Sequence, residues 1–178
     1  MIVEPLEIRG AALLRGSRHA DDRGFLRKPW VASEAAAHGL DVRVEEVVTT
    51  ANDVAGTIRG MHYQIAPHAE TKTLWVTDGV LFDVLVDLRP DEPTYGRWLS
   101  VVLAADDDVA VHVPEGVAHG YQTLADDTRL TYLLGASHAP EHARTLRWDD
   151  ESVRIEWPRP VTRTSSKDRE GHAWPPRP

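Results

Sequence analysis

The sequence predicts a mainly β protein, a closed double sheet such as a jelly roll, with a few short helices. Three observations predict this class: most of the chain has the pattern of short strands, glycine and proline turns separate these strands, and the one convincing helix is short. A chain of 178 residues predicts a single domain, residues 1–178. Its proline-rich end, from about residue 170 to residue 178, is expected to be a loose tail.

The expected helix lies in the N-terminal part of the chain. Ser33 is expected to be its N-cap, residues 34–38 its body, and Gly39 its end. In residues 74–88, the clearest strand signal, both faces are largely apolar except at Asp83 and Asp87, which share one side. We therefore expect both faces of this strand to be covered. Further strands are expected in residues 57–64, in 97–116 as two strands around an acidic turn at 106–108, and in 130–137.

Composition excludes several classes of function. The net charge of −8 argues against broad nucleic-acid binding, which needs a basic face. The absence of cysteine excludes disulfides, cysteine-ligated zinc, iron–sulfur clusters and a cysteine nucleophile. No apolar run approaches the roughly 18 residues of a membrane helix, and the start, MIVEPLEIRG, lacks the apolar core of a signal peptide. We therefore expect a cytoplasmic protein without nucleic-acid or membrane partners.

Common nucleotide-binding and hydrolase signatures are missing from the sequence. It contains no P-loop, GxGxxG, HExxH or GxSxG pattern, which disfavours a P-loop kinase, a Rossmann dehydrogenase, a zincin and an α/β-hydrolase. The candidate chemistry therefore rests on nine histidines and on the acids, tyrosines and arginines around them.

Two histidine motifs are the most informative. RGMHYQ (59–64) places His62 in a predicted strand, and PEGVAH (114–119) fits a P-x-G-x-x-H pattern that recurs in cupin jelly rolls, where its histidine can ligate a metal. Gln64 stands where the metal-binding cupin pattern H-x-H has its second histidine, so no metal is expected. The alternative is a metal-dependent oxygenase or isomerase built on His62, His68, Glu70 and His119.

The first motif raises a geometric question. Arg59 and His62 are three residues apart, so a regular strand would point them to opposite faces. If both serve one site, the chain has to bend or bulge near Gly60, where glycine permits it.

A series of stretches through the chain resembles the dTDP-4-dehydrorhamnose 3,5-epimerase family of metal-free, cupin-fold enzymes. The matching stretches are DDRGFL (21–26), RGMHYQ (59–64), FDVLVDLR with PTYGRW (82–98), VPEGVAHGYQTL (113–124), Tyr132, APEH (139–142), RWDD (147–150) and SSKD (165–168). They occur in the order and spacing of the family. The resemblance implies a cofactor-free isomerase of deoxysugar or antibiotic-sugar biosynthesis that inverts C3, C5 or both in a dTDP-4-keto-6-deoxyhexose.

The resemblance also implies the catalytic residues. The C4 ketone of such a substrate acidifies the hydrogens on C3 and C5, so epimerisation needs a base, an acid on the opposite face and a group that stabilises the enolate. His62 is the implied base, because an imidazole titrates near neutral pH. Asp168 is implied to hydrogen-bond its second nitrogen, and Tyr132 is the implied acid on the far face.

The implied binding residues surround this centre. Arg23 and Arg59 are implied to grip the nucleotide diphosphate, because guanidinium groups bind phosphate oxygens in a bidentate manner. Phe25 would pack against the thymine. The groups implied to lie near the enolate oxygen are Lys72 and His119, with Asp83 orienting His119. The family resemblance further implies a homodimer, often with exchange of N-terminal strands.

Several positions that line the pocket in the family depart from its pattern. Lys28 replaces a glutamate after the DRG motif, Val47 and Thr49 occupy the positions of a Q-x-N motif, Leu133 replaces a lysine and His138 replaces a tyrosine. Lys28 and His138 are therefore candidate substrate contacts, and His138 is a candidate alternative proton donor. The departures leave the sugar open, as well as the choice between C3 alone and both carbons. The second alternative is a family relative recruited to another substrate, or one that binds dTDP-sugars without catalysis.

Overall fold

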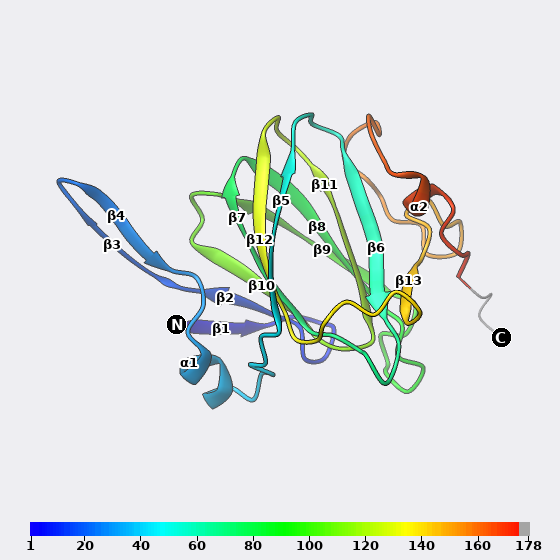
Figure 1. Ribbon diagram of the computed structural model, residues 1–178, viewed down its shortest axis with the longest axis horizontal. Helices are drawn as coiled ribbons and strands as arrows, with labels where there is room; N and C mark the ends of the chain where they lie inside the picture. The colour runs from blue at the N-terminus through cyan, green and yellow to red at the C-terminus, as the bar shows by residue number, and fades with distance from the viewer. Residues whose placement is uncertain (175–178) are drawn as a thin grey trace.

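The computed structural model describes residues 1–174, and two antiparallel sheets that face each other make up its body (Figure 1). In spatial order, the six-stranded sheet contains β1 (Ile2–Pro5), β2 (Ala12–Arg15), β10 (Val109–Val113), β7 (Lys72–Asp78), β12 (Thr128–Leu134) and β5 (Glu46–Asn52). The five-stranded sheet contains β13 (Ala143–Thr145), β6 (Ile58–Gln64), β11 (Val117–Thr123), β8 (Val80–Asp87) and β9 (Trp98–Ala104). This architecture confirms the predicted mainly β double sheet of the jelly-roll (cupin) type.

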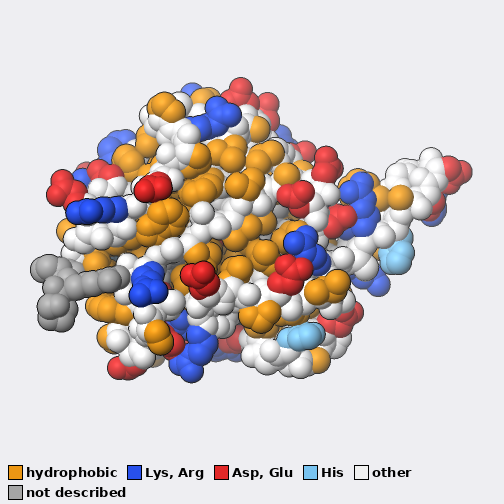
Figure 2. All heavy atoms as spheres, turned by 180° about the vertical axis from the view of Figure 1, so that it is seen from behind, with side chains coloured by type: hydrophobic (Ala, Val, Ile, Leu, Met, Phe, Trp, Pro, Cys, Tyr) orange, Lys and Arg blue, Asp and Glu red, His pale blue; other side chains and the backbone are white. Residues whose placement is uncertain are grey.

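Two helices and a hairpin lie outside the sheets. The helices are α1 (Ala32–Ala37) and α2 (Ser166–Arg169). The hairpin pairs β3 (Ser17–Asp21) with β4 (Gly24–Lys28) and projects far from the body of the molecule, as both outside views show (Figures 1 and 2). Within residues 1–174, none of the helices is long and apolar enough to cross a membrane.

The main hydrophobic core lies between the two sheets. Its buried side chains come from both of them, with Leu74 and Leu130 on one side and Leu81, Leu85 and Tyr121 on the other. A second cluster, centred on Met61 and Val84, covers the outer face of the five-stranded sheet with side chains of the C-terminal segment. The prediction that both faces of residues 80–88 are covered is thereby confirmed.

The predicted strand 74–88 is two strands in different sheets. β7 ends at Asp78 and β8 begins at Val80, and Gly79 makes the corner with a φ of +78°. A side chain at Gly79 would lie 2.4 Å from the hydroxyl oxygen of Thr128, so this corner has room only for glycine. The apolar strand pattern continues on both sides of Gly79, so the sequence alone does not reveal the corner.

Two further expectations differ from the structure. Val31 is the N-cap of helix α1, because its carbonyl accepts the first helical hydrogen bonds, and no side chain caps the helix. Ser33, the expected N-cap, therefore lies inside the helix. Residues 170–174 are not a loose tail: His172 pairs with Leu146 as a β-bridge, and the Trp174 amide donates to Asp150 (2.7 Å), where the ring is only 8% exposed. Residues 175–178 lie outside the described part of the chain.

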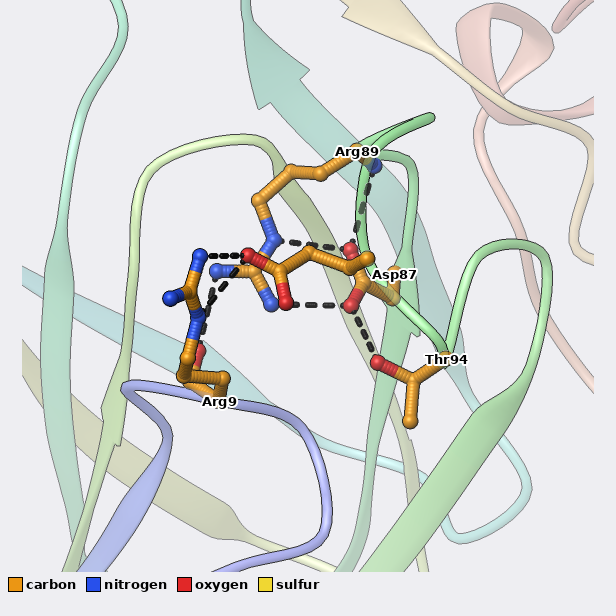
Figure 3. A network of polar contacts seen from close by, with 5 residues as sticks. Arg9, Asp87, Arg89 and Thr94 are labelled. Atoms are coloured by element: carbon orange, nitrogen blue, oxygen red, sulfur yellow. Dashed lines mark hydrogen bonds and ion pairs between the residues drawn. The ribbon is translucent and has the colours of Figure 1, made fainter.

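An ion-pair network at the end of β8 ties the N-terminal segment to the sheet (Figure 3). The fully buried carboxylate of Asp87 accepts hydrogen bonds from the Arg89 guanidinium (both 2.8 Å), from the Arg89 amide (3.1 Å) and from the Thr94 hydroxyl (2.6 Å). Arg89 also donates to the carbonyl of Arg9, which pairs with Glu92. The network fixes the loop after β8 at the far end of the strand that carries Asp83.

Candidate active site

A β-bulge in strand β6 turns Arg59 and His62 to the same side. His62 pairs with His119, and Arg59 pairs with Tyr121, so Gly60 and Met61 together oppose the single residue Gly120. Gly60 has a φ of +128°, and a side chain there would lie 2.6 Å from the α-carbon of Gly120. The bend expected near Gly60 is therefore confirmed, and glycine is required on both strands.

The bulged strand lines a cavity of about 250 Å³ between the two sheets. Six of the predicted site residues line it: Arg59, His62, Lys72, His119, Tyr132 and His138. Strands β6 and β11 contribute from one sheet, and strands β5, β7 and β12 contribute from the other. Side chains of opposite sheets can therefore reach one bound molecule from two faces.

His62 forms a hydrogen-bonded pair with Asp168. Its Nε2 lies 2.6 Å from Asp168 Oδ1, and Asp168 is held in helix α2, where its amide donates to the Ser165 hydroxyl (3.0 Å). Burial raises the pKa of Asp168, but hydrogen bonds from His62, Ser165 and the backbone of Gly60 outweigh burial and hold the pKa below its usual range. An ionised Asp168 that accepts a hydrogen bond from Nε2–H leaves Nδ1 of a neutral His62 as the nitrogen with the free lone pair.

A second histidine–aspartate pair lies beside Tyr132. His119 Nε2 is 2.7 Å from Asp83 Oδ1, and both residues are buried. Burial raises the pKa of Asp83, although the neighbouring His119 opposes this. The His119 ring packs edge-on against Tyr132, with 5.8 Å between the ring centroids. The pKa of Tyr132 is raised well above its ordinary value by burial, with Tyr121 and Asp83 adding to the effect, so its phenol stays protonated.

Lys72 is the buried cation of the cavity. It forms an ion pair with Glu70, whose side chain is also almost fully buried. Burial lowers the pKa of Lys72, and Glu70 counteracts the shift. The pair places one positive and one negative charge close together, and the low dielectric of the buried site strengthens the attraction between them.

The predicted residues Arg23, Phe25 and Lys28 do not line the cavity of their own chain. They belong to the projecting hairpin, where Arg23 pairs with Asp21 and Phe25 is 54% exposed beneath the guanidinium of Arg18. Arg59 is thus the one predicted phosphate-binding arginine at the cavity, and its Nε donates to Asn52 (2.8 Å).

The expected pocket positions on β5 are shifted by one residue. Val48 and Thr50 line the cavity, whereas Val47 is 65% exposed and Thr49 also points outward. Because neighbouring residues of a strand face opposite sides, Val47 and Thr49 cannot line the cavity when Val48 and Thr50 do. Leu133 likewise alternates away from the cavity-lining Tyr132.

The residues of the alternative metal site do not converge. Nε2 of His62 and Nε2 of His119 each form a hydrogen bond with an aspartate, and Glu70 forms an ion pair with Lys72. Within residues 1–174, the one group of three His, Asp or Glu side chains with ligand atoms within 4.8 Å of one another is His68, Glu141 and His142. Of the alternative set, only His68 belongs to it.

Sequence reasoning missed several cavity residues, among them Tyr121, Lys167 and Arg144. Tyr121 has a buried hydroxyl 3.1 Å from that of Thr50, and burial raises its pKa. Its position two residues after His119 on a strand, and hence on the same face, could have revealed it. Lys167 and Arg144 also line the cavity, and Lys167 directly precedes the predicted Asp168.

Comparison with known proteins identifies the family. The sequence profile for dTDP-4-dehydrorhamnose 3,5-epimerase matches residues 5–175. The chain belongs to this epimerase family. The dTDP-4-dehydrorhamnose 3,5-epimerase of Sinorhizobium fredii (strain NBRC 101917 / NGR234) is 37% identical over 166 residues, which cover 91% of this chain and 83% of the relative.

Solved structures of epimerases have the same fold. The rmlC epimerase of Mycobacterium tuberculosis superposes with a TM-score of 0.92 at 30% identity, covering 97% of this chain and 88% of the other. ChmJ, a 3'-monoepimerase from Streptomyces bikiniensis in complex with dTDP-quinovose, superposes with a TM-score of 0.88 at 30% identity, covering 96% and 86%. The similarity thus extends to 3,5-epimerases and to a monoepimerase.

Proposed function

We propose that this protein epimerises C3, C5 or both of a dTDP-4-keto-6-deoxyhexose in deoxysugar biosynthesis, through an enolate and without a cofactor. One observation carries the proposal: His62 and Tyr132 reach the same cavity from opposite sheets. Inversion of a carbon centre requires removal of a proton on one face and delivery on the other, which suits this arrangement.

The first step is proton abstraction by His62. The basic Nδ1 takes the proton on the carbon next to the C4 ketone, and the C–H electron pair forms the enolate. The ionised Asp168 stabilises the resulting imidazolium through the Nε2 hydrogen bond of 2.6 Å. Lys72 and His119 are proposed to face the enolate oxygen, where fixed donors in a dry site lower the barrier by several kcal/mol.

The second step is proton delivery by Tyr132. Its raised pKa keeps the phenol protonated until the enolate forms. The enolate carbon then takes the phenolic proton on the face opposite His62, and the ketone returns. Arg59, which acts to lower the pKa of Tyr132, would stabilise the transient phenolate.

The nucleotide part of the substrate is proposed to require a second copy of the chain. Arg23 and Phe25 lie on a hairpin that projects away from the cavity of their own chain, and Lys28 lies at the base of this hairpin. Hydrophobic side chains also gather across the face seen from behind (Figure 2), as expected for an interaction surface. We therefore propose a cytoplasmic homodimer in which the hairpin of one protomer reaches the diphosphate and thymine at the other.

Solvent exchange tests the proposal. The full-length protein is incubated with dTDP-4-keto-6-deoxyglucose in D2O, and proton NMR follows the C3 and C5 hydrogens. Deuterium at C3 and C5 indicates a 3,5-epimerase, and deuterium at C3 alone indicates a 3-epimerase. Absence of exchange at both carbons, with dTDP still bound, would mean a binding protein rather than an enzyme.

Two variants assign the roles. His62→Ala should abolish exchange, whereas Tyr132→Phe should retain some abstraction and lose delivery to the opposite face. His38→Ala, at an exposed histidine after helix α1, is the matched control and should exchange at the wild-type rate. Exchange at the wild-type rate in folded His62→Ala would show that His62 is not the base.

A further inference from the structure

A second group of potential ligands lies at the rim of the cavity. His68 follows the turn after β6, while Glu141 and His142 lie just before β13. The centroids of the two imidazole rings are 4.5 Å apart, and Glu141 Oε1 is 3.6 Å from Nδ1 of His142. Each residue offers one ligand atom, and these three atoms lie within 4.8 Å of one another.

The backbone holds the two segments together before any ligand binds. The Ile65 amide donates to the carbonyl of His142 (3.0 Å). The buried side chain of Gln64 donates to the carbonyls of His68 (2.9 Å) and Ser137 (3.2 Å) and accepts from the Ala139 amide (2.7 Å). Gln64 therefore bridges the segments that carry the three side chains, so little ordering remains to be done on binding.

One atom of the group makes no hydrogen bond within residues 1–174. Nδ1 of His142 is buried, and Glu141, at 3.6 Å, lies within ion-pair range but too far away for a hydrogen bond. Buried polar atoms without partners are rare in folded proteins, and an ion is one of the groups that satisfies them. His68 and Glu141 are exposed, so their side chains can rotate toward a common point.

We propose that His68, Glu141 and His142 bind one divalent transition-metal ion of the Zn²⁺ or Ni²⁺ type, with water completing the coordination. Two imidazole nitrogens and one carboxylate oxygen suit these ions, whereas Mg²⁺ and Ca²⁺ prefer oxygen ligands alone. Zinc bonds of about 2.0–2.1 Å require ligand atoms roughly 3.4 Å apart in a tetrahedron. Rotations of the exposed side chains of His68 and Glu141 can close the remaining gap.

The metal would act on the rim and not on the proton-transfer groups. Gln64, His138 and Arg144 belong to the bridged segments or adjoin them, and all three line the cavity. A bound ion cross-links these segments on the outside of the cavity, as Gln64 does on the inside. The proposal is independent of the proposed function, because neither the binding nor its measurement involves a sugar.

Calorimetric titration of the untagged, full-length protein with ZnCl2 and NiCl2 tests the site. We expect one ion per chain and no binding of MgCl2. His68→Ala and His142→Ala should each weaken binding at least ~10-fold, which is the loss seen when even an outer partner of a metal ligand is removed. Glu141→Gln should weaken it less, and His38→Ala, at an exposed histidine elsewhere, should bind as the wild type does.

A spectroscopic readout locates the ion. Ni²⁺ should broaden the imidazole NMR signals of His68 and His142 before those of the other histidines, with circular dichroism checking that each variant is folded. Absence of binding to the wild type at millimolar metal would overturn the proposal. Unchanged affinity and stoichiometry in a folded His68→Ala/His142→Ala double variant would overturn it as well.

Discussion

Two carboxylates of strand β8, Asp83 and Asp87, differ in how their buried charge is compensated. Both are fully buried and point to the same side of the strand. Asp87 accepts four hydrogen bonds, from Arg89 and Thr94, which together outweigh burial and lower its pKa. Asp83 accepts one, from His119. Within residues 1–174 its Oδ2 has no hydrogen-bond partner, and burial raises the pKa of Asp83.

The difference separates a structural end of the strand, at Asp87, from the end that lies at the proposed reaction cavity, at Asp83. At Asp87 the permanent charge of Arg89 compensates the carboxylate, so the network costs little to bury and fixes the loop. At Asp83 the partner is a titratable imidazole at the proposed reaction cavity, and the unpaired oxygen is a cost that stability alone would not favour. Strained or under-satisfied groups of this kind are typical of functional sites.

The largest expected effect is on stability, at Asp87. Asp87→Asn leaves the buried part of the Arg89 guanidinium without its counter-charge, and we expect a loss of about 3 kcal/mol in the free energy of unfolding. The turnover of the folded fraction should remain within a factor of ~2, since the network lies outside the cavity. Urea denaturation measures the first quantity, and exchange of the C3 hydrogen measures the second.

Asp91→Asn, at an exposed acid in the same loop, is the matched control and should change stability by less than about 0.5 kcal/mol. Equal losses in the two variants would show that the Asp87 network contributes nothing particular.

At Asp83 we expect a loss of turnover without a loss of stability. In Asp83→Asn, His119 loses the carboxylate that orients it, and kcat should fall about 10²-fold, which corresponds to roughly 2.7 kcal/mol in the barrier. The free energy of unfolding should not decrease, because a neutral amide is cheaper to bury than a carboxylate with a free oxygen. Denaturation and exchange kinetics on the same preparation measure both. If Asp83→Asn instead loses stability and keeps its kcat, Asp83 is a structural residue and the proposed contrast with Asp87 is wrong.

The acid dependence of stability should distinguish the same two groups. The depressed pKa of Asp87 means that its contribution is present above the ordinary value near 3.8 and is lost as the pH falls through the folded value. The raised pKa of Asp83 has the opposite sign: stability declines as the pH rises from 3.8 to the folded value.

Urea midpoints between pH 2.5 and 7 should therefore fall less steeply on acidification in Asp87→Asn than in the wild type. In Asp83→Asn the decline with rising pH should disappear. Parallel profiles for all three proteins would contradict both pKa directions.

Sequence reasoning predicted the class of fold because that information is local. Alternation and glycine turns mark strands wherever they lie, and the acidic turn at 106–108 separates β9 from β10 as expected. The corner at Gly79 was not predictable in this way, since apolar residues continue on both sides of it. The choice of Val47 and Thr49 failed for a related reason: register decides which residues of β5 face inward, and register depends on the partner strand β12.

The candidate site was predictable where its residues stand in motifs. The bend at Gly60 followed from strand parity once the family resemblance put Arg59 and His62 in one site, whereas the pairing of His62 with Asp168 spans 106 residues and followed from the resemblance alone. The strand pattern alone did not distinguish Asp83 from Asp87, because both are acids on one strand face; only the family resemblance implied a role for Asp83 beside His119. Their roles depend on partners contributed by another strand and by a loop.

The smallest expected effect tests whether the Asp87 network acts as a unit. Thr94→Val is nearly isosteric and removes the hydroxyl that donates to Asp87 Oδ2 at 2.6 Å, so we expect a loss of about 1.5 kcal/mol in the free energy of unfolding. In the Asp87→Asn background the same substitution should cost less, because a neutral amide is a weaker acceptor than a carboxylate. A double-mutant cycle by urea denaturation measures the coupling. Additive losses would mean that Thr94 stabilises the loop independently of Asp87, and the structural end of β8 would then rest on the Asp87–Arg89 pair alone.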